Sequence, residues 1–116
     1  MKPEQGFNLQ EHRAISAELK RASVSLLLIE SAIQARYGKS HRLAREVRKL
    51  FRCVEGSLRY HLDNDLHARH YKENRSEIKG IYYGGYSEFW PAGVDEFEFR
   101  TTVGEQWLAL KTGGDR

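Results

Sequence analysis

Cysteine, proline and long apolar runs are scarce in this 116-residue sequence. The single cysteine, Cys53, cannot form an internal disulfide and has no cysteine partner for a metal, so we expect a reducing compartment. The longest apolar run, Leu26 to Ile29, is far shorter than the roughly 20 residues of a membrane span. The residues after Met1 lack the hydrophobic stretch of a secretion signal. These absences predict a cytoplasmic protein without a membrane partner.

The composition indicates one ordinary globular domain. Hydrophobic residues make up 40% of the chain and charged residues 30%, and the length allows a single core. We therefore predict one domain over residues 1–116, formed by a helical hairpin (1–72) and a C-terminal segment (73–116). A chain of this size buries a modest share of its surface, so it would gain stability from a second subunit. We expect a homodimer.

A long amphipathic helix is predicted for residues 9–37, because apolar residues recur there at spacings of three and four. Asn8 and Glu11 have the spacing of a capping box, and Gly38 suits a left-handed stop. The main apolar seam consists of Ile15, Leu19, Ala22, Leu26, Ile29 and Ile33. A second seam on the opposite side consists of Ala17, Val24, Leu27, Leu28, Ser31 and Ala35. We expect this second seam to face another subunit rather than the C-terminal segment, because little sequence remains to cover a helix about 43 Å long.

A second helix is predicted for residues 40–71, with Ser40 as its N-cap. Only Gly38 and Lys39 separate it from the first helix, so the two helices should be antiparallel neighbours. Gly56 inside this helix lowers its intrinsic stability by about 1 kcal/mol relative to alanine, yet the apolar pattern continues past it. The apolar face consists of Leu43, Val47, Leu50, Phe51, Val54, Leu58 and Leu62. Two such hairpins would form a four-helix bundle on dimerisation.

A β-hairpin is predicted for residues 78–103. The stretch from Ile78 to Tyr83 is β-branched and aromatic, and apolar residues alternate with polar ones from Phe97 to Val103. Glu105 to Lys111 would form a short closing helix or a third strand. The expected fold class is thus α+β, predominantly α.

The most suggestive feature for function is a basic stripe on the second predicted helix, on the side turned away from its apolar face. Its members are Arg42, Arg45, Arg48, Lys49, Arg52 and Arg59. A rigid cationic row can neutralise successive phosphates, and arginine suits bidentate phosphate contact. The expected paired hairpins are similar in form to viral suppressors of RNA silencing, some of which bind double-stranded RNA, although no shared motif is present. We therefore predict a non-enzymatic protein that binds nucleic acid, with double-stranded RNA as the form that this similarity implies.

Two alternatives compete with this interpretation of the stripe. In the first, the stripe is a solvated helix face whose arginines pair with acids, for which the acidic stretch 95–98 is an internal candidate. In the second, the protein is an interaction or scaffolding module that binds a partner through Val24, Leu28 and Ala35.

The aromatic and glycine-rich stretch 81–90 could stack on bases, but a turn whose aromatic side chains cap the hairpin is the simpler interpretation.

A metal-dependent bundle enzyme is the lowest-ranked alternative. Its candidate ligands are His61, Asp65, His67 and His70, whose spacings of three and four place pairs on one helical face. A polar pair that enters a bundle core would need a partner, for which Glu30 is a candidate. Helical metal sites usually repeat a Glu-x-x-His motif, and that repeat is missing here. We therefore predict no catalytic residue, no metal and no cofactor.

Overall fold

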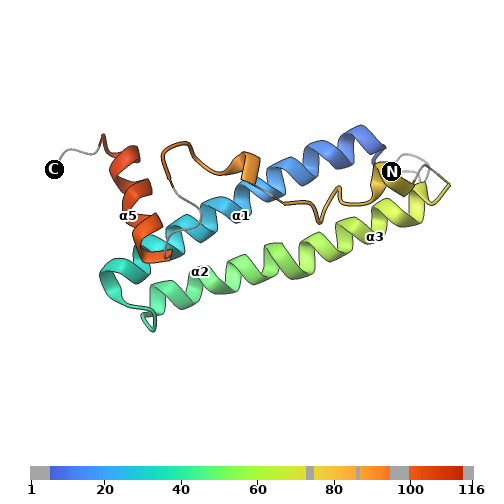
Figure 1. The fold of residues 1–116 in the computed structure, drawn as a ribbon. Helices are drawn as coiled ribbons and strands as arrows, with labels where there is room; N and C mark the ends of the chain where they lie inside the picture. The colour runs from blue at the N-terminus through green and yellow to red at the C-terminus, as the bar shows by residue number, and fades with distance from the viewer. Residues whose placement is uncertain (1–5, 73–74, 86, 95–99, 114–116) are drawn as a thin grey trace.

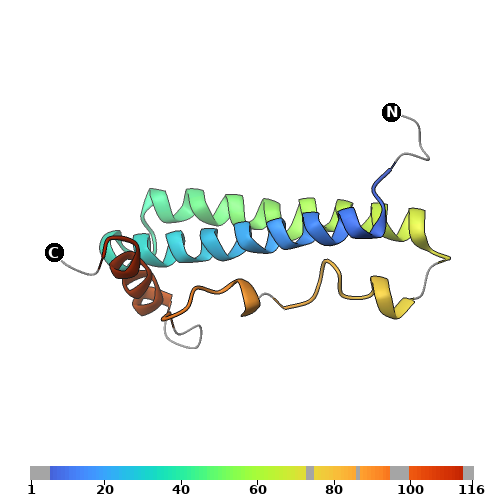
Figure 2. The same ribbon diagram turned by 90° about the horizontal axis from the view of Figure 1, so that it is seen from above.

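The computed structural model describes residues 6–72, 75–85, 87–94 and 100–113. Within these ranges the chain forms an antiparallel helical hairpin, with a C-terminal segment along one side of it (Figures 1 and 2). The first half of the hairpin is α1 (Leu9–Tyr37). The second half consists of α2 (Arg42–Arg52), the π-helical segment η2 (Cys53–Leu58) and α3 (Arg59–His70). The C-terminal segment contains α4 (Arg75–Ile78), the 3₁₀-helix η3 (Ser87–Phe89) and α5 (Arg100–Lys111).

Both ends of α1 are those that the sequence predicts. The side chain of Asn8 accepts a hydrogen bond from the backbone N–H of Glu11 at 2.8 Å, and the carboxylate of Glu11 accepts one from the Asn8 N–H at 2.9 Å. This capping box satisfies backbone donors that the first turn leaves unpaired. At the other end Gly38 has a φ of 97°, which a residue with a side chain rarely adopts. The capping box and Gly38 therefore fix the length of α1.

The second helix differs from its prediction in two places. It begins at Arg42 rather than Ser40, and its N-cap is His41, whose Nδ1 accepts from the Leu43 N–H at 3.1 Å. It is also interrupted by η2, which contains Gly56. A π-turn holds one residue more than an α-turn, so the residues that follow it are rotated by about 100° relative to an unbroken helix. The residues of α3 (Arg59–His70) therefore face other directions than those predicted for an unbroken helix.

The polar contacts between α1 and the second helix use residues one position beyond the predicted seam. Ser23, which follows Ala22, donates a hydrogen bond to Glu55, and Glu30, which follows Ile29, pairs with Arg48. These polar contacts determine which sides of the two helices face each other. The predicted apolar seam therefore lies between the helices at Ile15 and Leu19, which pack in one cluster with Leu66. At Ala22 and Ile29 it is displaced toward one face of the hairpin.

The expectation that the second seam of α1 faces another subunit is wrong for its central residues. Val24 and Leu28 are buried against Val94 and Val103 of the same chain, with Trp107 packed at the edge of this cluster. A close crossing permits this arrangement, because the backbone of Gly104 in α5 lies against α1 and donates a hydrogen bond to the Ser31 hydroxyl at 2.8 Å. A short segment covers the seam because α5 crosses α1 at a small residue.

The predicted β-hairpin is also wrong, because the described part of the C-terminal segment contains helices and turns and no strand. Ile78 and Tyr82, four residues apart, are both buried, whereas Tyr83 is exposed, and this is the pattern of a helical turn. Val103 and Trp107 have the same spacing and pack together with α1. The alternating residues 95–99 lie outside the described residues. Residues 105–111 are helical, which is one of the two alternatives that the sequence predicts. Their helix starts earlier, at Arg100.

Two apolar clusters stabilise the arrangement. One joins Leu19, Leu66, Ile78 and Tyr82 near the open end of the hairpin, and the other is the Val24 cluster beneath α5. Among the helices in the described ranges, none combines the length and the apolar character needed to cross a membrane. Where the structure describes it, the C-terminal segment leaves the outer side of α2 uncovered (Figure 2).

Candidate nucleic-acid interface

Four members of the predicted basic stripe are exposed on the outside of α2. Arg42, Arg45, Lys49 and Arg52 all lie on the solvent side of this helix. Lys49 forms an exposed ion pair with Glu46 at 3.2 Å. No ion pair to Arg42, Arg45 or Arg52 is formed within the described residues. These three guanidinium groups are therefore available to an external anion.

Arg48 is anchored to the hairpin rather than free. Its Nε lies 2.9 Å from a carboxylate oxygen of Glu30, which is only 1% exposed, and its Nη2 donates to the Lys39 carbonyl at 3.1 Å. Gln34 donates to the same Glu30 oxygen at 2.9 Å. Arg48 therefore compensates a buried carboxylate and ties the start of α2 to α1.

Arg59 does not lie on the exposed side of the helix with the other members of the stripe. It is 8% exposed, and its Nη2 lies 2.6 Å from Glu55, while its guanidinium lies over the ring of Tyr83. Without η2, Arg59 would point close to the direction of Arg52; the extra residue of the π-turn rotates it toward α1. The prediction that Arg59 belongs to the nucleic-acid surface is therefore wrong.

An open cleft lies beside the exposed arginines, at the turn between α1 and α2. Its volume is about 520 Å³, and it is lined by Gln34, Lys39, Ser40, Arg45 and Arg48. Cationic side chains thus surround the space, with the neutral donors of Gln34 and Ser40 between them. Tyr37, which is 60% exposed, lies next to this turn with its ring centroid 5.0 Å from that of His41. The arrangement can hold a phosphate in the cleft and offers an aromatic surface beside it.

The candidate metal ligands are not brought together. Asp65 binds His12 and Arg69, His67 pairs with Asp63 at 3.3 Å, and His70 lies 2.9 Å from the Phe7 carbonyl. His61 is exposed and makes a ring contact with Tyr60. Glu30, the suggested partner of His61 and Asp65, pairs with Arg48 instead. In the part of the chain that the structure describes, no three His, Cys, Asp or Glu residues are placed to hold a metal ion.

A buried polar network that the sequence analysis missed links three segments of the chain. The ring of His12, which is fully buried, lies 2.6 Å from the Tyr82 hydroxyl through Nδ1 and 3.0 Å from Asp65 through Nε2. Burial lowers the pKa of His12 and raises that of Tyr82 to about 12, so the imidazole and the phenol are neutral near pH 7. Burial opposes ionisation of Asp65, but the hydrogen bonds from Arg69 and His12 outweigh it and lower its pKa. The Nε2–H therefore donates to the carboxylate, and Nδ1 accepts from Tyr82.

The sequence signal for this network was weak. His12 lies on α1 among residues assigned to neither seam, and Tyr82 belongs to the aromatic stretch 81–90. Tyr82 is buried in the core and Tyr83 is exposed, while Tyr86 lies outside the described residues. A spacing of four between His12 and Ser16 on the contact side of α1 was the available clue.

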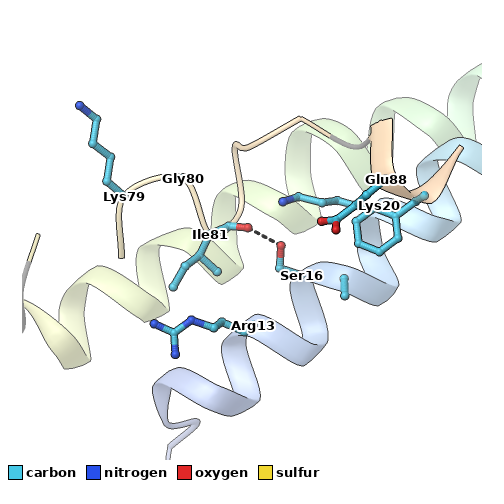
Figure 3. Close-up of a pocket in the computed structure, with 9 residues that line it drawn as sticks. Arg13, Ser16, Lys20, Lys79, Gly80, Ile81 and Glu88 are labelled. Atoms are coloured by element: carbon cyan, nitrogen blue, oxygen red, sulfur yellow. Dashed lines mark hydrogen bonds between the residues drawn. The ribbon is translucent and has the colours of Figure 1, made fainter. Parts of the chain in front are cut away.

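A second, smaller cleft of about 290 Å³ lies between α1 and the turn after α4 (Figure 3). Lys20 on its wall is 9% exposed; burial and the nearby Arg59 lower its pKa, while Glu88 opposes the shift. Arg13 and Lys79 also line the cleft, but Figure 3 shows Lys79 pointing away from the other labelled side chains. The labelled cations of this cleft therefore do not converge on one position.

Neither protein-family models, nor curated proteins, nor solved structures yield a match to this chain.

Proposed function

We propose that this protein binds nucleic acid, without catalysis, through the sugar–phosphate backbone. The proposed surface consists of Arg42, Arg45, Lys49 and Arg52 on the outside of α2, together with the cleft at the α1–α2 turn. The observation that carries the proposal is the cleft, in which Lys39, Arg45 and Arg48 surround one open space beside unpaired arginines.

The dimensions of the surface suit a polyanion. Arg42 and Arg52 are about 15 Å apart along the helix axis, since each helical residue rises 1.5 Å. A duplex carries one phosphate charge per 1.7 Å, so about nine charges lie within that length. The four exposed cations can therefore approach phosphates without any particular base sequence, and we propose little sequence preference.

The acids near this surface pair with Lys49 and Arg48 and leave the other arginines of the surface unpaired within the described residues. Glu46 engages Lys49, and Glu30, which is buried, engages Arg48. The acidic stretch 95–98, which the sequence analysis named as a competitor, lies outside the described residues. Arg45 and Arg52 are therefore the two side chains whose positive charges are most directly available to an external anion.

Fluorescence anisotropy with labelled duplex RNA tests the proposal, with duplex DNA and single-stranded RNA as comparison ligands. Reversal of two charges in Arg45→Glu with Arg52→Glu should weaken binding by at least about tenfold, because it replaces attraction to phosphates by repulsion. Both side chains are exposed, so the circular dichroism of the helices should not change.

A matched control changes the net charge by the same amount at distant positions. Lys72 follows α3 and Lys111 ends α5, and both are exposed. Lys72→Glu with Lys111→Glu should leave at least half of the affinity. The proposal is wrong if wild type does not bind any of the three nucleic acids, or if both double variants lose affinity equally.

A further inference from the structure

The hairpin has an apolar face that the described residues of the C-terminal segment do not cover. Leu43, Leu50 and Leu58, on α2 and η2, are 41%, 57% and 47% exposed. Leu43 and Leu50 are two helical turns apart, and the extra residue of η2 keeps Leu58 in line with them. They therefore form one continuous ridge on the second helix.

A matching ridge lies on α1, formed by Ala22, Ile29 and Ile33. In each helix, the residues that contact the partner helix follow the ridge by one position. Ser23 and Glu30 follow Ala22 and Ile29, and Ala44, which is fully buried, follows Leu43. The two helices are antiparallel, and in both of them the contact residues lie on the same side of the ridge. A two-fold axis normal to the plane of the hairpin therefore relates the helices, and it places both ridges on the same face of the hairpin. We call these six residues the open face.

The C-terminal segment packs elsewhere. Val94 and Val103 contact Val24 and Leu28. At about 100° per residue, the mean direction of Val24 and Leu28 lies about 130° around α1 from that of Ala22 and Ile29. Figure 2 likewise shows the C-terminal segment along one side of the hairpin only. The described part of the segment therefore leaves the open face accessible.

We propose that the open face binds the same face of a second copy of this chain, so that two hairpins form a four-helix bundle. The face contains no charged residue among its six members, so an apolar partner fits it and a nucleic acid does not. Its spacings of three and four are those of a bundle core. A two-fold interface must be complementary to itself, and two antiparallel apolar ridges satisfy this condition.

The size of the face also fits a second copy. It extends over residues 22–33 and 43–58, about 20 Å along the helices and about 20 Å across them. This is about 400 Å² for each subunit and about 800 Å² in total, which is the size of a weak and transient interface. The dimer should therefore form reversibly at concentrations of about 100 μM.

The interface leaves the proposed nucleic-acid surface free. Arg45 and Arg52 lie about 160° around α2 from Leu43 and Leu50, as follows from about 100° per residue. The dimer would carry two basic surfaces on its outside. Dimerisation and nucleic-acid binding are therefore separable in experiments.

Sedimentation velocity on the full chain, from about 1 to about 200 μM, tests the proposal by mass action. Wild type should shift from 13.5 kDa toward twice that mass as concentration rises. Leu50→Glu places a charge in the centre of the face and should remain monomeric throughout. Because Leu50 is 57% exposed, this change removes little packing, and unchanged circular dichroism would verify the fold. Leu58→Glu is a second variant with the same expectation.

The matched control is Leu110→Glu. Leu110 is 54% exposed on α5, outside the hairpin, so this variant should dimerise like wild type. A wild type that stays monomeric at the highest concentration overturns the proposal. A folded Leu50→Glu chain that still dimerises also overturns the proposal, because the copies would then contact each other through another surface. RNA binding by monomeric Leu50→Glu would show that the nucleic-acid proposal stands independently.

Discussion

The Nδ1 atom of His12 lies 2.6 Å from the hydroxyl of Tyr82, seventy residues further along the chain. This hydrogen bond connects the start of α1 to the C-terminal segment, and the opposite ring nitrogen connects it to Asp65 on α3. All three segments that meet near the open end of the hairpin are thus joined through one imidazole. A buried network of this kind is stabilising only while every member is paired.

Removal of the Tyr82 hydroxyl should therefore destabilise the fold. Tyr82→Phe leaves the buried Nδ1 without its donor, which should lower the free energy of unfolding by about 1–3 kcal/mol. Urea denaturation followed by circular dichroism measures the change. The control is Tyr83→Phe, because Tyr83 is 55% exposed and its hydroxyl forms no hydrogen bond within the described residues. Equal stabilities of the two variants would show that the Tyr82 hydrogen bond contributes nothing.

Acidification should destabilise the protein through His12. Burial lowers its folded-state pKa below the ordinary value of 6.5, so the unfolded chain binds a proton more readily than the folded chain. The stabilising contribution is therefore complete above pH 6.5 and is lost as the pH falls through the folded-state pKa. Asp65, whose pKa is lowered from 3.8, adds a second loss only below that value.

The test compares wild type with His12→Gln at about pH 7.5 and about pH 5, where Asp65 stays ionised. Wild type should lose more stability between the two conditions, because glutamine does not titrate. Parallel losses would show that His12 does not cause the pH dependence.

The crossing of α5 and α1 depends on the absence of a side chain at Gly104. A Cβ atom there would overlap the backbone of Ser31 and Ala32, which cannot move aside as a flexible side chain would. Gly104→Ala should therefore lower the free energy of unfolding by about 1–3 kcal/mol. The matched change is Gly56→Ala, which meets no atom within 4 Å and should raise stability by about 0.5–1 kcal/mol. Thermal unfolding of both variants measures the difference, and a neutral Gly104→Ala would contradict the close crossing.

Arg48 should contribute more to stability than its exposed neighbour. Arg48→Met leaves the buried Glu30 carboxylate without its cation, which should cost about 2–3 kcal/mol. Lys49→Met removes only an ion pair in which both side chains are more than half exposed, which should cost less than about 1 kcal/mol. Chemical denaturation separates the two. If Arg48→Met were as stable as Lys49→Met, Arg48 would belong with the free arginines.

The sequence was sufficient to predict the parts of this fold that depend on local signals. The capping box at Asn8, the glycine at position 38 and the apolar spacing between them determine α1, because each acts within a few residues. The short connection then determines the antiparallel partner. The exposed arginines of α2 were predictable for the same reason, since the helical period alone places Arg42, Arg45 and Arg52 on its outer side.

The remaining features depend on contacts between distant residues. Nothing local at Gly56 distinguishes a tolerated glycine from a π-turn, yet that turn moves Arg59 from the expected phosphate surface into the hairpin. The spacing of Val103 and Trp107 fits a helix, and the preceding alternation of apolar and polar residues fits a strand equally well. The helix forms where it packs on Val24 and Leu28 of α1. Glu30 similarly finds its partner in Arg48, which sequence spacing assigned to the outer surface.

The salt dependence of duplex RNA binding tests the proposed function most directly. Each phosphate contact adds close to one unit to the slope of log affinity against log salt, so neutral replacements at two contact residues should flatten that slope by about 1.5–2. Arg45→Gln with Arg52→Gln is the informative pair, because both guanidinium groups are exposed and unpaired within the described residues. If Arg45 and Arg52 contact phosphates, this variant should bind more weakly and with the flatter slope. A slope equal to that of wild type would show that the outer side of α2 does not contact the phosphates.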